Sequence, residues 1–300
     1  MKIEEGVDLA RYTTFGSGGP VRGFLRARNE DDIVEAFVWA AERNLPILPL
    51  GFGSNLLVAD AGIEALALRL EGALASVEIE GEMMIAGGGA ADALCARLAQ
   101  AAGLSGLEFA ASIPGTVGGG VCMNAGAWGS NFGAVLSRAM VAEREGVRWL
   151  GRRQLGLRYR GSELGSGQIV VWAEFLLERS SAEEIESGVQ AKKAQRKSSQ
   201  PSGIRTFGSV FRNPDHELGA GRMIDACGLK GEQIGGARIS LQHANFIENC
   251  GGATTADALA LIELARRRVH EQFGVVLEPE VRLVGGISLA PVEADSPGRE

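Results

Sequence analysis

Residues 112–127 carry almost no large side chains, and this segment constrains the fold more than any other part of the chain. It reads SIPGTVGGGVCMNAGA, with five glycines among sixteen residues. Glycine adopts backbone conformations that other residues avoid, and it lets a ligand approach the main chain closely. Successive exposed N–H groups in such a loop form a concave anion site suited to a diphosphate. A glycine-rich turn between two strands is the alternative, and these residues alone leave both open.

A second loop of small residues, GFGSNLL at positions 51–57, lies upstream. Two such loops in one chain favour a dinucleotide that is held from two sides. The loop does not fit the Rossmann fingerprint, because Leu56 stands where the third glycine belongs and a strand-like stretch follows in place of a helix. The glycines at 87–89 do precede a helix, but their third position also fails.

Length and charge limit the classes of protein that remain. A chain of 300 residues is long enough for two or three domains with hydrophobic cores, and its hydrophobic content of 45% is that of an ordinary globular protein. The net charge of −7 argues against a general nucleic-acid binder. An anionic substrate remains compatible with it, because a local arginine cluster can act inside an acidic protein.

Cysteines and histidines are sparse and far apart. The four cysteines form no CxxC pair, and the three histidines have no metal-ligand spacing, so no metal site is predicted. The N-terminus has no signal pattern, and no apolar run reaches the length of a membrane span. We therefore expect a cytoplasmic protein without a membrane or nucleic-acid partner.

Hydrophobic periodicity and capping residues predict a mixture of helices and strands, beginning with a βαβ-like unit. Residues 198–203, SSQPSG, are the best linker candidate, and the polar stretch from about residue 287 is expected to be disordered. Helices are predicted at 30–43, 90–102, 181–197, 220–227 and 254–273, and the last strand is predicted at 275–284.

Nine short motifs occur in the order typical of one family. The motifs are TTF with GGP at 13–20, GSNLL at 53–57, IPGTVGG at 113–119, MNAGA at 123–127, YRGS at 159–162, GSVFRNP at 208–214, GLKG at 228–231, HANF at 243–246 and LEPEVR at 277–282. With these motifs the chain resembles the UDP-N-acetylenolpyruvoylglucosamine reductase (MurB) family of bacterial flavoenzymes over about residues 12–285.

The resemblance implies an α+β fold of the vanillyl-alcohol-oxidase (PCMH) type that binds FAD, followed by a C-terminal α+β substrate-binding domain. It implies FAD-binding subdomains at residues 1–70 and 71–197 and a substrate-binding domain at 198–286, leaving 287–300 as the tail. The spacer between Pro214 and Ala220 is very short, which is typical of the shorter, type II form. A monomer is the family default.

The implied activity is that of a UDP-N-acetylmuramate dehydrogenase of peptidoglycan synthesis. NADPH reduces non-covalently bound FAD, which then transfers a hydride to the enolpyruvyl group of UDP-N-acetylglucosamine enolpyruvate. Hydride addition leaves an enolate, which needs positive charge near its oxygens and a proton at carbon. A preference for NADPH over NADH is carried by the resemblance alone.

By resemblance, three residues are catalytic. Ser209 is the proton donor, Arg160 binds the substrate carboxylate and stabilises the enolate, and Glu280 polarises the intermediate. Each also has an ordinary alternative on sequence alone: a turn serine, a solvated loop arginine, or an exposed Glu280–Arg282 pair.

The resemblance also assigns binding residues in the same motifs. The cofactor residues are Gly51, Gly53, Ser54, Asn55, Leu56, Ser112, Ile113, Pro114, Gly115, Thr116, Gly118, Gly119, Asn124, Ala125 and Gly126. The substrate residues are Tyr159, Asn213, Arg222, Lys230, His243 and Arg282. A structural histidine at 243 and a helix-end lysine at 230 are the alternatives there.

Phe52 and Arg212 depart from the family pattern, which often has glycine and lysine at these positions, and we expect both to be tolerated. Two other functions stay open: a flavin oxidase of the same fold, and a non-catalytic protein that binds flavin or a UDP-sugar. The oxidase would not require Ser209, Arg160 and Glu280 together, and its reduced form would react quickly with oxygen.

Overall fold

The computed structural model of the protein describes residues 2–292, which divide into two compact units. Unit 1 holds residues 2–7, 21–53 and 64–198, and unit 2 holds residues 8–20, 54–63 and 199–292. The boundary after residue 198 falls in the predicted linker. Residues 71–197 share a unit with most of residues 21–70, and the finer division at residue 70 stays a prediction.

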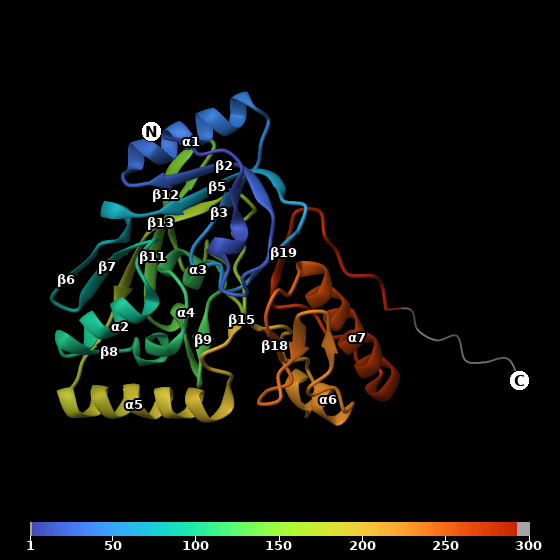
Figure 1. Ribbon diagram of the computed structural model, residues 1–300. Coiled ribbons are helices and arrows are strands. Elements are labelled where there is room, and N and C mark those ends of the chain that lie inside the picture. The colour runs from blue at the N-terminus through green and yellow to red at the C-terminus, as the bar shows by residue number, and fades with distance from the viewer. Residues whose placement is uncertain (1, 293–300) are drawn as a thin grey trace, which may run out of the picture. The chain divides into compact units, whose positions relative to one another are not determined.

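Unit 1 contains two larger sheets and two small strand pairs (Figure 1). The first sheet has the order β1 (Val7–Asp8), β2 (Pro20–Ala27), β5 (Ile63–Leu70), β3 (Ile47–Pro49). The second is antiparallel, with the order β12 (Gly146–Gly151), β11 (Leu136–Glu143), β13 (Ile169–Leu176), β7 (Met83–Gly87), β6 (Val77–Glu80). The small pairs are β8 (Leu104–Ser105) with β14 (Glu178–Arg179), and β9 (Gly126–Ala127) with β10 (Ser130–Asn131).

Strand β13 separates two hydrophobic cores of unit 1. Ile169 and Val171 join the core under helix α1 (Glu30–Glu42), whereas Ala173 and Phe175 join the core around helices α2 (Asp92–Ala101), α3 (Val117–Cys122) and α4 (Phe132–Val135). Burial on both faces explains why residues 169–173 of this strand are all apolar. In Figure 1, α1 covers the sheet that contains β2 and β5, and α5 (Ala182–Ser199) lies at the other end of the unit.

The helix starts of unit 1 follow the predicted capping chemistry. The Asn29 side chain accepts a hydrogen bond from the Asp32 N–H at 3.0 Å and so caps α1. Ser181 and Glu184 bond to each other's backbone N–H groups at 3.2 and 3.3 Å, which is the predicted capping box of α5. Three short 3₁₀ helices lie at Leu9–Tyr12, Gly72–Ala75 and Glu108–Ser112, the first of them in unit 2.

Unit 2 is a four-stranded antiparallel sheet with two helices. The strand order is β15 (Arg205–Ser209), β18 (Phe246–Asn249), β17 (Ala237–Ile239), β16 (Gln233–Ile234), and the helices are α6 (Ala220–Ala226) and α7 (Thr255–Phe273). Leu261, Ile262 and Val269 of α7 are fully buried in its core. Helix α7 has a full capping box at Thr254 and ends at Gly274, which adopts φ +66°.

Residues 54–63 belong to unit 2 because they pair with its C-terminal part. Strand β4 (Leu56–Val58) pairs in parallel with β19 (Arg282–Val284), and the Asp60 carboxylate accepts from the N–H groups of Thr255 and Ala256 at 2.9 and 3.0 Å. The strand predicted at 275–284 is present only at Arg282–Val284, with one isolated bridge at Pro279. The regular strand pairing is interrupted here because the Val210 carbonyl accepts hydrogen bonds from the N–H groups of both Glu280 and Val281.

The structure differs from the predicted disordered tail over residues 287–292. The buried Arg266 donates to the carbonyls of Leu277 and Ala290 at 3.1 and 2.8 Å, and the Ala290 N–H donates to Glu263 at 3.2 Å. These bonds hold the segment against α7. Residues 293–300 of the predicted tail lie outside the described residues.

Candidate active site

The two glycine-rich loops meet in unit 1 at Gly51 and Thr116. A Cβ built on Gly51 would lie 2.5 Å from the Thr116 hydroxyl oxygen, so a larger residue at 51 would displace this side chain. Gly53 also lies in unit 1, with φ +64°, but Ser54, Asn55 and Leu56 belong to unit 2. The structure therefore brings the start of the first loop to the second and ties its other half to the C-terminal residues.

Main-chain hydrogen bonds fix the second loop against residues 88–92. Gly118 donates to the Gly88 carbonyl at 2.8 Å, Val117 donates to Ala90 at 2.9 Å, and Asp92 donates to Gly115 at 3.1 Å. A Cβ on Gly88 would lie 1.9 Å from the Val170 carbonyl oxygen. Several glycines are thus required by backbone packing, and the N–H of Gly118 is already used by the protein.

Asp92, beside this loop, and Ser112, at its start, have buried side-chain oxygen atoms without a hydrogen-bond partner among residues 2–292. Asp92 is fully buried, and its carboxylate oxygen lies 2.5 Å from where a Cβ of Gly115 would stand. Burial raises the pKa of Asp92 from 3.8 to about 8, so the group is neutral at pH 7. Burial is also the main cause that raises the pKa of the neighbouring Cys95 to about 12.

Asp92 was not among the predicted site residues. An acidic residue in the first turn of a helix is an ordinary surface feature, so the sequence carried no signal of its burial. Buried polar atoms without partners are rare in folded proteins and mark places where a ligand or water completes the bonding. Ser112 was predicted to bind the cofactor, and its hydroxyl group, which has no partner among residues 2–292, fits a cofactor-binding role.

Arg160 lies at the tip of a tight turn in unit 1. Arg158 and Gly161 exchange backbone hydrogen bonds at 2.9 and 3.2 Å, which leaves Tyr159 and Arg160 as the two central residues. Arg160 adopts φ +54°, and its guanidinium lies 5.3 Å from the centre of the exposed Tyr159 ring. Its Nη1 donates to the Gly126 carbonyl at 2.5 Å, so the turn contacts the predicted flavin residues 124–126.

Ser209 and Glu280 are far apart in sequence but lie on adjacent chain segments of unit 2. The Glu280 N–H donates to the Val210 carbonyl at 2.8 Å, and Phe211 and Pro279 form an isolated antiparallel bridge. Asn55 joins the same group, because its Nδ2 donates to the Glu280 carbonyl at 3.1 Å and its own carbonyl accepts from Arg282 at 3.0 Å. Gly208 has φ +80° and approaches the Ser54 carbonyl.

Asn245 organises this group and was missed as a site residue, although it lies in the HANF motif. Its side chain is buried and pairs with both backbone groups of Phe211, accepting from the N–H at 2.9 Å and donating to the carbonyl at 2.8 Å. Its carbonyl accepts from Val210. A buried asparagine with this pattern holds the chain that follows Ser209 in place.

Several predicted substrate residues of unit 2 already have protein partners. Lys230 forms an ion pair with Asp225 at 2.7 Å, and Asn213 accepts from the N–H of Ala220 at 3.1 Å. His243 is half-buried, and its Nδ1 accepts from the Asn245 N–H at 3.2 Å. Desolvation is the main cause that lowers the pKa of His243, so the neutral ring carries its proton on Nε2. Arg222 and Arg282 are exposed.

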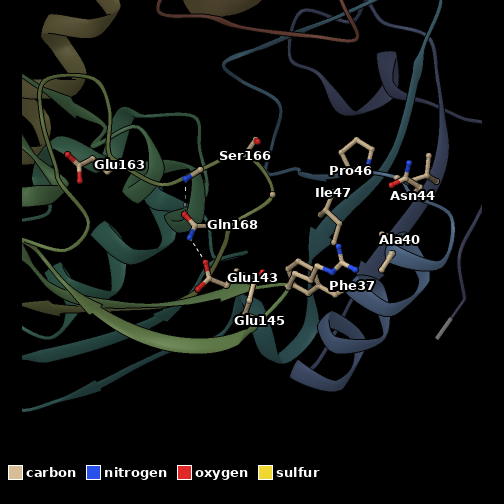
Figure 2. A pocket seen from close by; sticks show the side chains of 15 residues that line it. Phe37, Ala40, Asn44, Pro46, Ile47, Glu143, Glu145, Glu163, Ser166 and Gln168 are labelled. Carbon is tan, nitrogen blue, oxygen red and sulfur yellow. Dashed lines mark hydrogen bonds between the residues drawn. The ribbon is translucent and has the colours of Figure 1, made fainter.

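An open cavity of about 850 Å³ lies elsewhere in unit 1, between α1, the β11–β12 turn and residues 163–168. Figure 2 shows Glu143, Glu145 and Glu163 at its walls, with Gln168 donating to Glu143 at 2.5 Å. None of the predicted site residues lines it. Within residues 2–292 no group of three or more His, Cys, Asp or Glu residues could hold a metal ion, and no helix is long and apolar enough to span a membrane.

Comparison with known proteins shows the family to which the chain belongs. The UDP-N-acetylenolpyruvoylglucosamine reductase C-terminal domain matches residues 200–284, and an FAD binding domain matches residues 21–150. A UDP-N-acetylenolpyruvoylglucosamine reductase of Rubrobacter xylanophilus is 41% identical over 92% of this chain and 93% of its own length. The chain belongs to this reductase family. The predicted family and fold class are confirmed.

Other members of the reductase family are similar over nearly their whole length. The reductase of Bacillus velezensis is 39% identical over 95% of both chains. The crystal structure of UDP-N-acetylenolpyruvylglucosamine reductase (MurB) from Thermus caldophilus, 36% identical, superimposes with a TM-score of 0.84 and covers 95% of this chain and 99% of its own.

The residues of unit 1 fit the FAD that this domain binds. Ser112 offers an unsatisfied hydroxyl group, and Gly51 and Gly115 leave no room for a side chain beside Thr116 and Asp92. The loop thus presents main chain and small polar groups, which suits a diphosphate. The individual cofactor contacts stay predictions.

Proposed function

We propose that the protein reduces the enolpyruvyl group of UDP-N-acetylglucosamine enolpyruvate to give UDP-N-acetylmuramate, using NADPH and bound FAD. The observation that carries this proposal is membership of the reductase family over 92% of the chain. FAD supplies the hydride transfer, so the chain must bind the substrate, stabilise the developing enolate and deliver one proton.

Arg160 binds the substrate carboxylate and stabilises the enolate. A guanidinium group offers parallel donors that match a carboxylate, and it stays charged at all physiological pH values. Arg160 adopts φ +54°, which is unfavourable for a residue other than glycine. Such backbone strain persists only where the surrounding structure enforces it. The bond to the Gly126 carbonyl supports this position.

Ser209 donates the proton, and Glu280 acts on the same intermediate. The hydrogen bonds from Glu280 to Val210 and from Asn55 to Glu280 support the pair, since they hold the two residues on adjoining segments of unit 2. Tyr159, Asn213, Arg222, Lys230, His243 and Arg282 are proposed to bind the substrate. The neutral His243 would donate through Nε2.

Replacement of Ser209 tests the assignment. In Ser209→Ala, NADPH should still bleach the flavin at the wild-type rate, whereas reoxidation by the substrate should slow by about 10²–10⁴-fold, the usual contribution of a positioned general acid. Ser202→Ala, a serine in the linker region, is the matched control and should leave both steps unchanged. Equal slowing of both steps in Ser209→Ala would refute the role of Ser209 as proton donor.

A further inference from the structure

Three hydrogen bonds join residues 158–162, which include the Arg160 turn, to residues 122–126. Ser162 Oγ donates to the Cys122 carbonyl at 2.7 Å, Asn124 Nδ2 donates to the Arg158 carbonyl at 3.0 Å, and Arg160 Nη1 donates to the Gly126 carbonyl at 2.5 Å. Their partners are alternate residues, 122, 124 and 126, at the end of α3 and in the MNAGA motif. This regular spacing makes the two segments one assembly.

Asn124 is the centre of this assembly, and both polar atoms of its side chain bond to the protein. Besides donating to Arg158, it accepts from the Gly133 N–H through Oδ1 at 2.8 Å. The residue is only 7% exposed and adopts φ +41°, which asparagine tolerates better than most residues. The amide therefore bridges Gly133 and the Arg160 turn.

The Arg158 carbonyl links the Asn124 side chain to the turn that carries Arg160. This carbonyl also accepts from the Gly161 N–H and so closes the turn around Tyr159 and Arg160. Both of its acceptor positions are occupied when Asn124 is present. Removing the Asn124 donor would free one end of a turn whose central residue is held at an unfavourable φ.

We infer that Asn124 is a positioning residue for Arg160: its side-chain amide orients the arginine turn, so that the flavin loop also aligns the group that binds the substrate carboxylate. This inference rests on the proposed function. It adds a second role to the sequence-based assignment, in which Asn124 is a cofactor-binding residue. One donor and one acceptor of the amide are engaged within the protein.

Two substitutions separate the side-chain amide from the backbone conformation. Asn124→Asp keeps the shape and the acceptor for Gly133 but replaces the donor with an oxygen that repels the Arg158 carbonyl. Asn124→Gly removes both bonds while favouring φ +41°. Asn44, at φ +53° on the surface, provides the matched control Asn44→Asp.

In the holoenzyme, Asn124→Asp and Asn124→Gly should bleach with NADPH at a rate within threefold of wild type and bind FAD within threefold. Reoxidation by UDP-N-acetylglucosamine enolpyruvate should slow at least 30-fold, and backbone amide exchange of residues 158–162 should accelerate in the FAD-free protein. Asn44→Asp should change none of these.

A double-mutant cycle completes the test, because residues that act through one another are not additive. In an Arg160→Ala background, adding Asn124→Asp should slow reoxidation less than twofold further. Multiplicative effects, or a slowing fully explained by weaker FAD binding, would overturn the inference. A wild-type enzyme that the substrate fails to reoxidise would instead overturn the proposed function.

Discussion

Asp92 should make the stability of unit 1 fall as the pH rises. Its pKa is about 8 in the folded chain and 3.8 when exposed, so between these values the folded state holds one proton more than the unfolded state. The free energy of unfolding must then fall by about 1.4 kcal/mol per pH unit. At pH 7 the accumulated loss is 3.2 units times this slope, or about 4 kcal/mol.

Asp92→Asn removes this proton uptake, so the variant should lose this pH dependence. The asparagine itself shifts stability by an amount that does not depend on pH, whereas the difference from wild type should grow in favour of the variant by about 3 kcal/mol from pH 5 to pH 7. The assay is urea unfolding at fixed excess FAD, followed by tryptophan fluorescence. All four tryptophans, Trp39, Trp128, Trp149 and Trp172, lie in unit 1 with Asp92.

Asp257→Asn is the control for a carboxyl group whose pKa is lowered, and because Asp257 lies in unit 2 its unfolding is followed by circular dichroism. Backbone hydrogen bonding from Thr254 is the main cause that lowers the pKa of Asp257, so the stability that this carboxylate adds is lost only as the pH falls below its ordinary range. The control should therefore shift stability by a constant amount from pH 5 to pH 8. A constant difference between Asp92→Asn and wild type over this range would refute the neutral buried carboxyl group.

Two further substitutions test the packing and the capping. Gly88→Ala should destabilise unit 1 by about 3 kcal/mol or more in urea unfolding, because its Cβ would lie 1.9 Å from the Val170 carbonyl oxygen. The control Gly151→Ala should change stability by no more than about 1 kcal/mol, because its Cβ would meet nothing closer than 3.7 Å. Thr254→Ala should lower the free energy of unfolding by about 1 kcal/mol, because the N–H of Asp257 loses its acceptor at 3.0 Å at the start of α7. Urea unfolding followed by circular dichroism measures this loss, and an unchanged midpoint would contradict the capping role of Thr254.

The helix ends could be predicted from residues that are close together in the sequence. Asn29, the Ser181–Glu184 pair and Thr254 cap helices as the sequence predicts, because a cap needs only residues within one turn. Gly274 ends its helix for the same local reason. The family motifs added the fold class, which periodicity alone did not supply.

Long-range placement was beyond the sequence. Nothing near residue 56 indicates that β4 pairs with β19, since the partners lie more than 200 residues apart. In the sequence Asp92 resembles a surface residue, and only the structure shows that Gly115 packs against its carboxyl group. Likewise, the MNAGA motif marks Asn124 for the cofactor, and only the structure shows its amide bonded to Arg158 and Gly133.

An anaerobic two-step experiment on the purified wild-type holoenzyme tests the proposed function most directly. One equivalent of NADPH should bleach the flavin, and UDP-N-acetylglucosamine enolpyruvate should then restore the oxidised spectrum rapidly, with UDP-N-acetylmuramate as the product. Bleaching that only oxygen reverses would contradict the proposed reaction and favour an oxidase.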